Sequence, residues 1–322
     1  MKTFLLILNK TSLPICLMAI LRINSAYSQA SFVQDARGES SVMSPGGSGI
    51  VFNTSDAAIS ISFLKAKSSS PFYWGIDAKF KAEEGISLVV KNGNINPTGK
   101  VGGVFVWESK PNKGKWNNFY LSPAVSFSSS KLFDDQTNLF ADQIAKKQFT
   151  AVSLKAAFNR TSHRKLFCSE CESSPTILGI SGTIGTTTNL GNLTKLDVIT
   201  YTILKDESGQ ERKLETGQTS AFSPLSKYQD NLGYAQINVD WIIFPMVFQS
   251  RAAIAIFSRS KFANKMLPTH SPGAGIFLTK EGSPTDIVGG IVTQITDVFN
   301  VNDQPNGPKN RIVLSLVAGY SF

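Results

Sequence analysis

Apolar side chains occupy every second position in the last twelve residues of this 322-residue chain. They are Ile312, Leu314, Leu316, Ala318, Tyr320 and Phe322. The positions between them include Ser315, Gly319 and Ser321. Because successive side chains of a β-strand point to opposite faces of the sheet, this alternation predicts a strand with one apolar face.

The same alternation recurs along the chain in runs of about ten residues that are separated by turn-forming clusters. It is clearest at residues 73–81, 118–127, 150–158 and 233–243. Weaker strands are predicted at residues 57–65, 100–108, 176–186, 193–204, 247–258, 271–279 and 286–298. Such a pattern is expected when one strand face meets lipid and the other a lumen. With the last strand, it predicts an all-β, transmembrane, antiparallel up-and-down β-barrel of about 12 strands, within a range of about 10–14.

The N-terminus carries the features of a secretory signal peptide. Met1 and Lys2 precede two apolar runs, residues 4–8 and 13–23, and Ala26-Tyr27-Ser28 offers a small-residue cleavage pattern. We therefore predict a signal peptide at 1–28, a periplasmic lead-in at 29–56 and the barrel at 57–322. A retained membrane anchor is the alternative. No later segment has the roughly 18 consecutive apolar residues that a spanning helix needs.

The end of the chain resembles the C-terminal signature of outer-membrane β-barrel proteins. The matching features are the terminal Phe322, Tyr320 two residues before it, and the alternating apolar residues upstream. The resemblance implies the outer membrane of a Gram-negative bacterium, contact with its lipids, and recognition of Tyr320 and Phe322 by the barrel assembly machinery. The Ser-rich and Asn-rich texture is similar to that of outer-membrane proteins of Bacteroidota. A soluble β-sandwich is the alternative fold.

At two places the predicted connections are longer than the periplasmic turns of such barrels normally are. With twelve strands, residues 110–115, 161–174, 205–231 and 300–310 are extracellular loops. Residues 82–99 and 128–149 are then periplasmic, where connections are normally short. The second of these also contains a helix-like stretch at 133–147. Either these two connections form a lid or plug, or a strand pair is missing from the assignment.

Charged residues make up 17% of the chain, and the formal charge of +9 becomes +6 once Lys2, Lys10 and Arg22 leave with the signal peptide. The alternation places six charged side chains on the lumen face: Asp77, Lys79, Lys81, Lys155, Asp240 and Arg311. Basic side chains around a pore favour anions. Equally, these charges can pair with one another and fill the interior. No basic cluster with interleaved aromatics indicates nucleic-acid binding.

Cys168 and Cys171 are the two cysteines that remain after the predicted cleavage. With His163 and Glu172 they make a poor match to known zinc sites. Nothing suggests the helix N-terminus that would activate a redox dithiol. We therefore predict a disulfide that tightens an extracellular loop in an oxidising compartment.

Two histidines, His163 and His270, limit the catalytic hypotheses. Barrel enzymes that resemble phospholipases use a Ser, a His and an Asn on neighbouring strands, and barrel proteases use Asp and His. Both histidines are predicted in loops, with no Asp or Asn at a telling spacing. We therefore predict no catalytic residue, and no cofactor or metal.

The function predicted from the sequence is a non-enzymatic outer-membrane barrel that passes small solutes passively. The alternative is a structural or accessory barrel with a filled lumen, which acts through its long loops. A barrel hydrolase is the third hypothesis. The solute is left open.

The C-terminal signature leads to a first testable prediction. Converting Tyr320 and Phe322 to Ser should impair assembly and leave unfolded protein in the periplasm, because the assembly signal is lost. Fractionation and heat-modifiability on gels measure this. Undiminished insertion of the variant would contradict the resemblance.

Overall fold

The structure is a computed structural model, and it describes part of the chain. The described residues are 35, 39–42, 49–54, 58–66, 70–81, 90–91, 94–95, 98–109, 115–134, 136–137, 143–164, 174–190, 193–205, 210–245, 248, 251–280, 283–301 and 311–321. The predicted signal peptide, Cys168, Cys171 and Phe322 lie outside this part. Tyr320 is described as strand backbone only.

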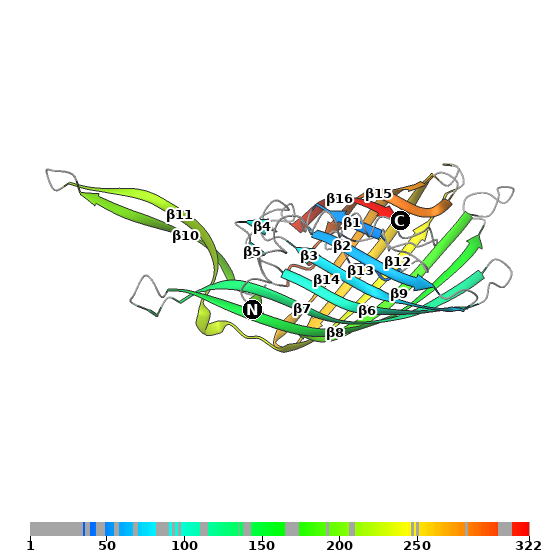
Figure 1. Cartoon of the computed structure of the whole chain (residues 1–322), viewed down its shortest axis with the longest axis horizontal. Helices are drawn as coiled ribbons and strands as arrows, with labels where there is room; N and C mark the ends of the chain where they lie inside the picture. Colours follow the sequence, from blue (N-terminus) through cyan, green and yellow to red (C-terminus); the bar gives the residue numbers. More distant parts are fainter. Residues whose placement is uncertain are drawn as a thin grey trace, which may run out of the picture.

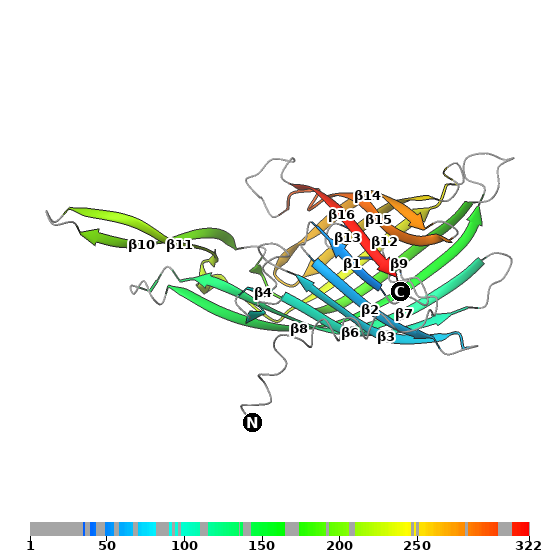
Figure 2. The ribbon, with the colours of Figure 1, turned by 45° about the horizontal axis from the view of Figure 1, so that its top comes forward.

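Twelve antiparallel strands close into a barrel (Figures 1 and 2). They are β1 (Gly49–Asn53), β2 (Ala58–Ala66), β3 (Phe72–Lys81), β6 (Thr98–Glu108), β7 (Lys115–Phe133), β8 (Ile144–Arg164), β9 (Ser174–Thr187), β12 (Leu232–Ile243), β13 (Ala252–Ala263), β14 (Met266–Lys280), β15 (Ser283–Ile295) and β16 (Ile312–Ser321). Each strand pairs with the next one in this order, and β16 pairs with β1 to close the ring. The prediction of an all-β, up-and-down barrel of about 12 strands is confirmed.

The two ends of the barrel differ in the length of their connections. Gly49 pairs with Ser321, and we call this end the C-terminal rim and the opposite end the far rim. At the far rim, β7 and β8 continue beyond the barrel as a long hairpin, and β10 (Thr194–Lys205) and β11 (Glu211–Ser223) form another (Figure 1). A single bridge, Phe222 to Leu132, joins β11 to β7. The short strands β4 (Val90–Lys91) and β5 (Asn94–Ile95) lie between β3 and β6 in the chain.

Two differences from the predicted strands offset each other in the count. Strand β1 lies within 29–56, the segment predicted to precede the barrel, and its five residues are too few to show a period. The predicted strand at 193–204 became β10, which lies outside the barrel wall because it pairs with β11 alone. The predicted total of twelve strands was therefore right, although one barrel strand was missed and one strand outside the barrel was counted.

The missed strand β1 resolves the conflict in connection lengths. Because one more strand precedes β2, every connection between β2 and β9 lies at the end of the barrel opposite to the one predicted. Residues 82–99 and 128–149 therefore connect strands at the far rim, with the other long connections. The connections 110–115 and 161–174, predicted on the extracellular side, lie at the opposite, C-terminal rim. The helix-like stretch at 133–147 was also wrong, because β7 reaches Phe133 and β8 begins at Ile144.

Large apolar side chains cover the outside of the barrel, and polar ones line its inside. Exposed residues include Trp74, Ile76, Val152, Ile184, Ile237, Ile256, Ile276, Ile291, Leu314 and Leu316. Buried polar residues include Asn53, Lys79, Asn159, Ser181, Asn238, Asp240, Arg259, Gln294 and Ser315. This reverses the arrangement of a soluble protein and fits a membrane-embedded barrel, whose outer face meets acyl chains. Within the described part of the chain, no helix is long and apolar enough to cross a membrane.

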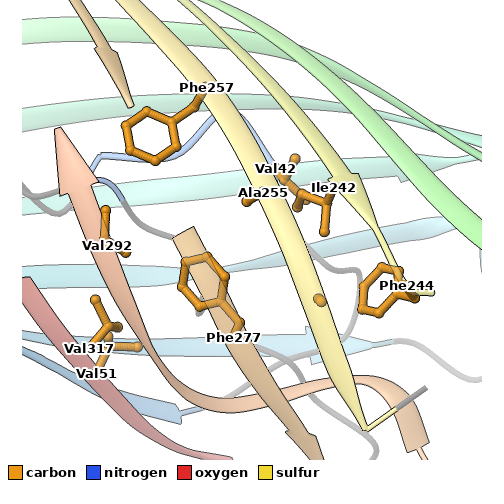
Figure 3. Close-up of a cluster of buried hydrophobic side chains, with 10 residues drawn as sticks. Val42, Val51, Ile242, Phe244, Ala255, Phe257, Phe277, Val292 and Val317 are labelled. Atoms are coloured by element: carbon orange, nitrogen blue, oxygen red, sulfur yellow. The ribbon is translucent and has the colours of Figure 1, made fainter. Parts of the chain in front are cut away.

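Two separate apolar clusters line opposite walls of the lumen. One gathers side chains from β12 to β16 and from β1, among them Ile242, Phe257, Phe277, Val292 and Val317 (Figure 3). The other joins Val104 and Val106 of β6 to Tyr120 of β7 and Ala157 of β8. Since the strands of the two clusters belong to opposite halves of the ring, whatever lies between them spans the lumen.

The outer face yields a prediction that depends on depth. Ile256, in the middle of β13 and 50% exposed, should tolerate Arg poorly, at a cost of about 2–4 kcal/mol of folding free energy in lipid. Phe262 lies one residue from the end of β13, and its change to Arg should cost about 0–1 kcal/mol. Urea titration in lipid vesicles measures both changes. Equal costs at the two positions would contradict a lipid-facing surface.

Candidate functional site

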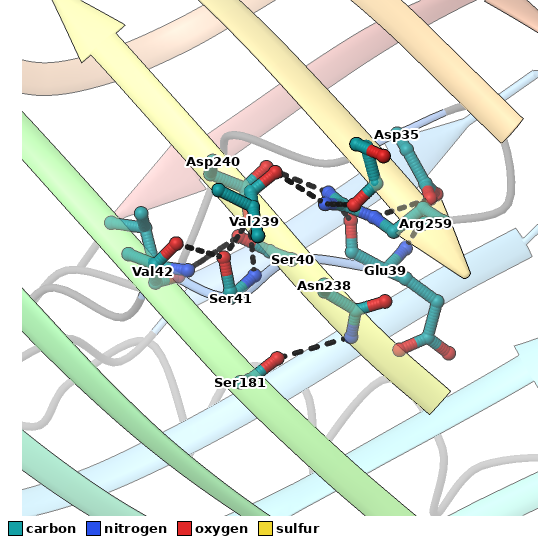
Figure 4. A network of polar contacts seen from close by, with 12 residues as sticks. Asp35, Glu39, Ser40, Ser41, Val42, Ser181, Asn238, Val239, Asp240 and Arg259 are labelled. Atoms are coloured by element: carbon teal, nitrogen blue, oxygen red, sulfur yellow. Dashed lines mark hydrogen bonds and ion pairs between the residues drawn. The ribbon is translucent and has the colours of Figure 1, made fainter. Parts of the chain in front are cut away.

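A short stretch of the N-terminal chain lies inside the barrel. It consists of residue 35 and residues 39–42, which we call the lumen segment (Figure 4). Ser41 is 0% exposed and Asp35 is 1% exposed, so both are enclosed by the barrel wall. The segment therefore occupies part of the lumen.

Arg259 of β13 is the main polar anchor of the lumen segment. Its Nε donates a hydrogen bond to Asp35 Oδ2 at 2.9 Å, and its Nη2 donates to Asp240 Oδ1 at 2.7 Å. Nη2 also donates to the Glu39 carbonyl at 3.2 Å. Because its side chain is only 6% exposed, the guanidinium needs these partners, and its planar fork reaches both carboxylates at once.

Asp240 of β12 uses its second oxygen to hold Ser41. The backbone N–H of Ser41 donates to Asp240 Oδ2 at 2.7 Å, and the Ser41 hydroxyl lies within hydrogen-bond distance of the same oxygen and of the Gly179 carbonyl. A Cβ added at Gly179 would lie 2.7 Å from Val42 Cγ2 and 2.8 Å from Asn159 Oδ1. Glycine at 179 therefore makes room for the segment.

The wall on the other side of β9 also binds the lumen segment. Tyr120 Oη donates to the Ser41 carbonyl at 3.2 Å, and Lys155 Nζ donates to the Ser40 carbonyl. On the other side, Val42 packs into the apolar cluster formed by β12 to β16 and β1. Across the ring from β9, Asn53 Nδ2 of β1 donates to the Asp35 carbonyl at 3.0 Å, so the lumen segment is held from both sides of the barrel.

Glu39 is the charged side chain that the segment brings into the lumen. Its backbone is fixed by an exchange of hydrogen bonds with Asp35, and its carboxylate points away from Arg259 (Figure 4). Burial raises the pKa of Glu39, but attraction to the lysines at positions 100, 79, 155 and 81 outweighs burial and lowers this pKa to about 2. Glu39 therefore stays ionised at any physiological pH.

The structure brings most of the predicted lumen charges together. Asp77, Lys79 and Lys81 lie on the inner face of β3, and Lys155 and Asp240 contact the lumen segment directly. Arg311 lies instead in the turn before β16, where it donates to the Asp297 carbonyl at 2.7 Å. It therefore anchors the far rim rather than the lumen wall.

The sequence reasoning missed three parts of this site. Arg259 was overlooked because the predicted strand ended at 258, one residue short of it. Tyr120 lies within the predicted strand at 118–127, but no partner was predicted for it. The lumen segment had no periodicity, so nothing in it signalled burial; only its serines and acidic residues, which can satisfy buried polar groups, gave a weak sign.

Both histidines lie on strands, so their predicted loop positions were wrong. His163 is exposed near the end of β8, and its ring lies 6.1 Å from that of Trp116. His270 lies on β14, with Nδ1 2.6 Å and Nε2 3.4 Å from the hydroxyls of Ser260 and Ser258. Within the described residues, those two serines are the hydrogen-bond partners of the His270 ring. A serine does lie beside a histidine, but the third residue that orients a catalytic ring is not among these partners.

A groove of about 730 Å³ lies on the barrel near the far rim. Its lining includes the exposed side chains of Val152, Leu154, Ile184 and Phe262. These side chains belong to the outer, apolar face. The groove therefore lies on the outer side of the wall and is separate from the lumen.

Comparison with known proteins gives no match. No protein-family model matches the chain, and no curated protein matches it. The functional inference therefore depends on the geometry of the lumen.

The anchor at Arg259 can be tested by labelling. With Cys168 and Cys171 changed to Ser, a Ser40→Cys probe should react slowly with a membrane-impermeant maleimide, since Ser40 is 8% exposed. Adding Arg259→Gln should speed the reaction at least tenfold, because removing one partner of a buried charge pair costs about 2–5 kcal/mol. Arg251→Gln, an exposed site at the C-terminal rim, is the control. Equal rates in all three proteins would contradict the role of Arg259.

Proposed function

We propose that the protein is a β-barrel of the outer membrane that passes small solutes without catalysis, and that its lumen segment holds this passage closed. One observation carries the proposal: residues 35 and 39–42 lie inside the barrel and are hydrogen-bonded to β7, β8, β12 and β13 and, from across the ring, to Asn53 of β1.

The membrane location is supported by the outer face of the barrel. Exposed apolar side chains surround it, as acyl chains require. The predicted signal peptide and the C-terminal signature at Tyr320 and Phe322 favour the outer membrane among the membranes of the cell. The short connections and Ser321 share one rim, which we place on the periplasmic side, so that the far-rim hairpins face outward.

A passage is favoured because the side chains of the wall do not merge into one core that fills the lumen. The two apolar clusters remain separate, and only one of them includes a residue of the segment, Val42. Most other contacts of the segment are hydrogen bonds, each worth a net of about 0.5–1.5 kcal/mol against water for a neutral partner and about 1.5–3 kcal/mol for charged Arg259, Asp240 or Lys155. Water can replace these bonds, so the segment can leave without unfolding the barrel.

The second candidate is the accessory barrel, and one observation favours it. The hairpins β7–β8 and β10–β11 extend from the far rim, and β10–β11 is tied to the barrel by the single bridge at Phe222 (Figure 2). A hairpin held this loosely has two long strand edges on which a partner can add a strand. In this candidate the lumen segment is a permanent filling.

Two glycines of β9 provide a matched test of closure. Gly179→Ala puts a methyl group against Val42 and Asn159, and overpacking of this kind costs about 1–3 kcal/mol. We expect the open fraction in planar-bilayer recordings to rise about tenfold or more. Gly182→Ala is the control, because its Cβ would meet nothing within 4 Å, and it should stay as closed as the native protein.

A deletion separates the two candidate functions. Mature protein that lacks residues 29–42 should show discrete conductance steps if the segment closes a passage. An inserted deletion variant that carries no current would refute the passage and favour the accessory barrel.

A further inference from the structure

Two lysines face each other across neighbouring strands inside the lumen. Lys79 of β3 is the direct partner of Lys100 of β6, and Lys81 lies two positions further along the same inner face of β3. Like charges directly opposite one another destabilise a sheet, and Lys79 is only 9% exposed, so water screens the repulsion poorly. An anion nearby relieves this repulsion.

In the described part of the wall, a further lysine and one carboxylate lie near this pair. Lys155 of β8 reaches the same region, where its Nζ donates to the Ser40 carbonyl. Asp77 lies among them on β3, whereas Asp240 is already bound to Arg259 and Ser41. Glu39 of the lumen segment is attracted to all four lysines, so it adds a second carboxylate to this region.

We propose that Lys79, Lys81, Lys100 and Lys155 form a binding site for a small anion with carboxylate or phosphate oxygens, and that Glu39 occupies this site while the barrel is closed. The inference rests on the proposed passage, because a solute reaches the site when the lumen segment leaves it. Glu39 then acts as a tethered competitor of the solute.

The position of the lysines suits the entrance of the passage. Lys81 pairs with Thr98 at the far-rim ends of β3 and β6, so the site begins at that rim. An anion that enters from the far rim therefore reaches Lys81 at the end of its strand. The site therefore selects the solute and senses its presence.

Because Glu39 is tethered to the barrel, the tether sets the solute concentration that is needed to displace it from the lysines. A short flexible tether holds its ligand at an effective concentration on the order of millimolar. A monovalent inorganic ion such as chloride competes weakly, because it lacks the several oxygens that can accept bonds from lysines on different strands. A divalent carboxylate or phosphate in the millimolar range should displace Glu39.

The first experiment records single channels of the mature protein in planar bilayers. Succinate or phosphate replaces chloride at constant ionic strength. We expect either anion to raise the open fraction several-fold at millimolar concentration, and Glu39→Gln to raise it without any added anion. The larger response of the two shows which oxygen chemistry the site prefers.

The chain offers a matched lysine control. Lys131 and Lys146 also pair directly across two strands, but both are exposed on the β7–β8 extension. The double change Lys79→Gln with Lys100→Gln should abolish the response to succinate and phosphate. The double change Lys131→Gln with Lys146→Gln should leave it intact. An equal response in both double variants would overturn the proposed site.

A second measurement distinguishes the site from the passage. In the variant that lacks residues 29–42, added succinate or phosphate should raise the thermal unfolding midpoint, because a ligand that binds the folded state stabilises it. If this variant conducts but shows no anion stabilisation, the anion site is refuted and the passage stands. If it is stabilised but never conducts, the passage fails and the anion site stands.

Discussion

The guanidinium of Arg259 joins the wall of the barrel to the chain inside it, and the closed lumen depends on this contact. A buried cation is costly unless its donors are satisfied, and Arg259 meets this need with Asp35 and Asp240 together with three backbone carbonyls. The two carboxylates lie 205 positions apart in the sequence. One side chain therefore fixes where the N-terminal chain crosses a barrel built by the rest of the protein.

The size of the barrel explains why such a crossing chain is useful. Twelve strands enclose a lumen between those of small barrels, which side chains fill, and those of open porins. Here the wall side chains form two separate apolar clusters, and the lumen segment bridges the gap with Val42 on one side and backbone carbonyls on the other. Water can replace the hydrogen bonds that hold the lumen segment, whereas it cannot replace the contacts of a fully apolar core.

The sequence was informative wherever a strand was long enough to show its period. The alternation in 73–81 placed Asp77 and Lys79 on the inner face, and the pattern of 311–322 identified the closing strand. Strand β1 was missed because five residues carry too little pattern, and β10 alternates like a wall strand although it pairs outside the ring. The lumen segment was beyond prediction, since the hydrogen bond from Ser41 to Asp240 joins residues 199 positions apart. Contacts of that range leave no local trace.

Amide hydrogen exchange of the folded, unmodified protein in lipid tests the central claim directly. The Ser41 N–H donates to a buried carboxylate at 2.7 Å, and the Glu39 N–H donates to Asp35 at 2.8 Å. With the segment bound in the lumen, both amides should exchange orders of magnitude more slowly than those of an unstructured chain. Exchange of both amides at the unstructured rate, in protein whose barrel strands remain protected, would contradict the closed lumen.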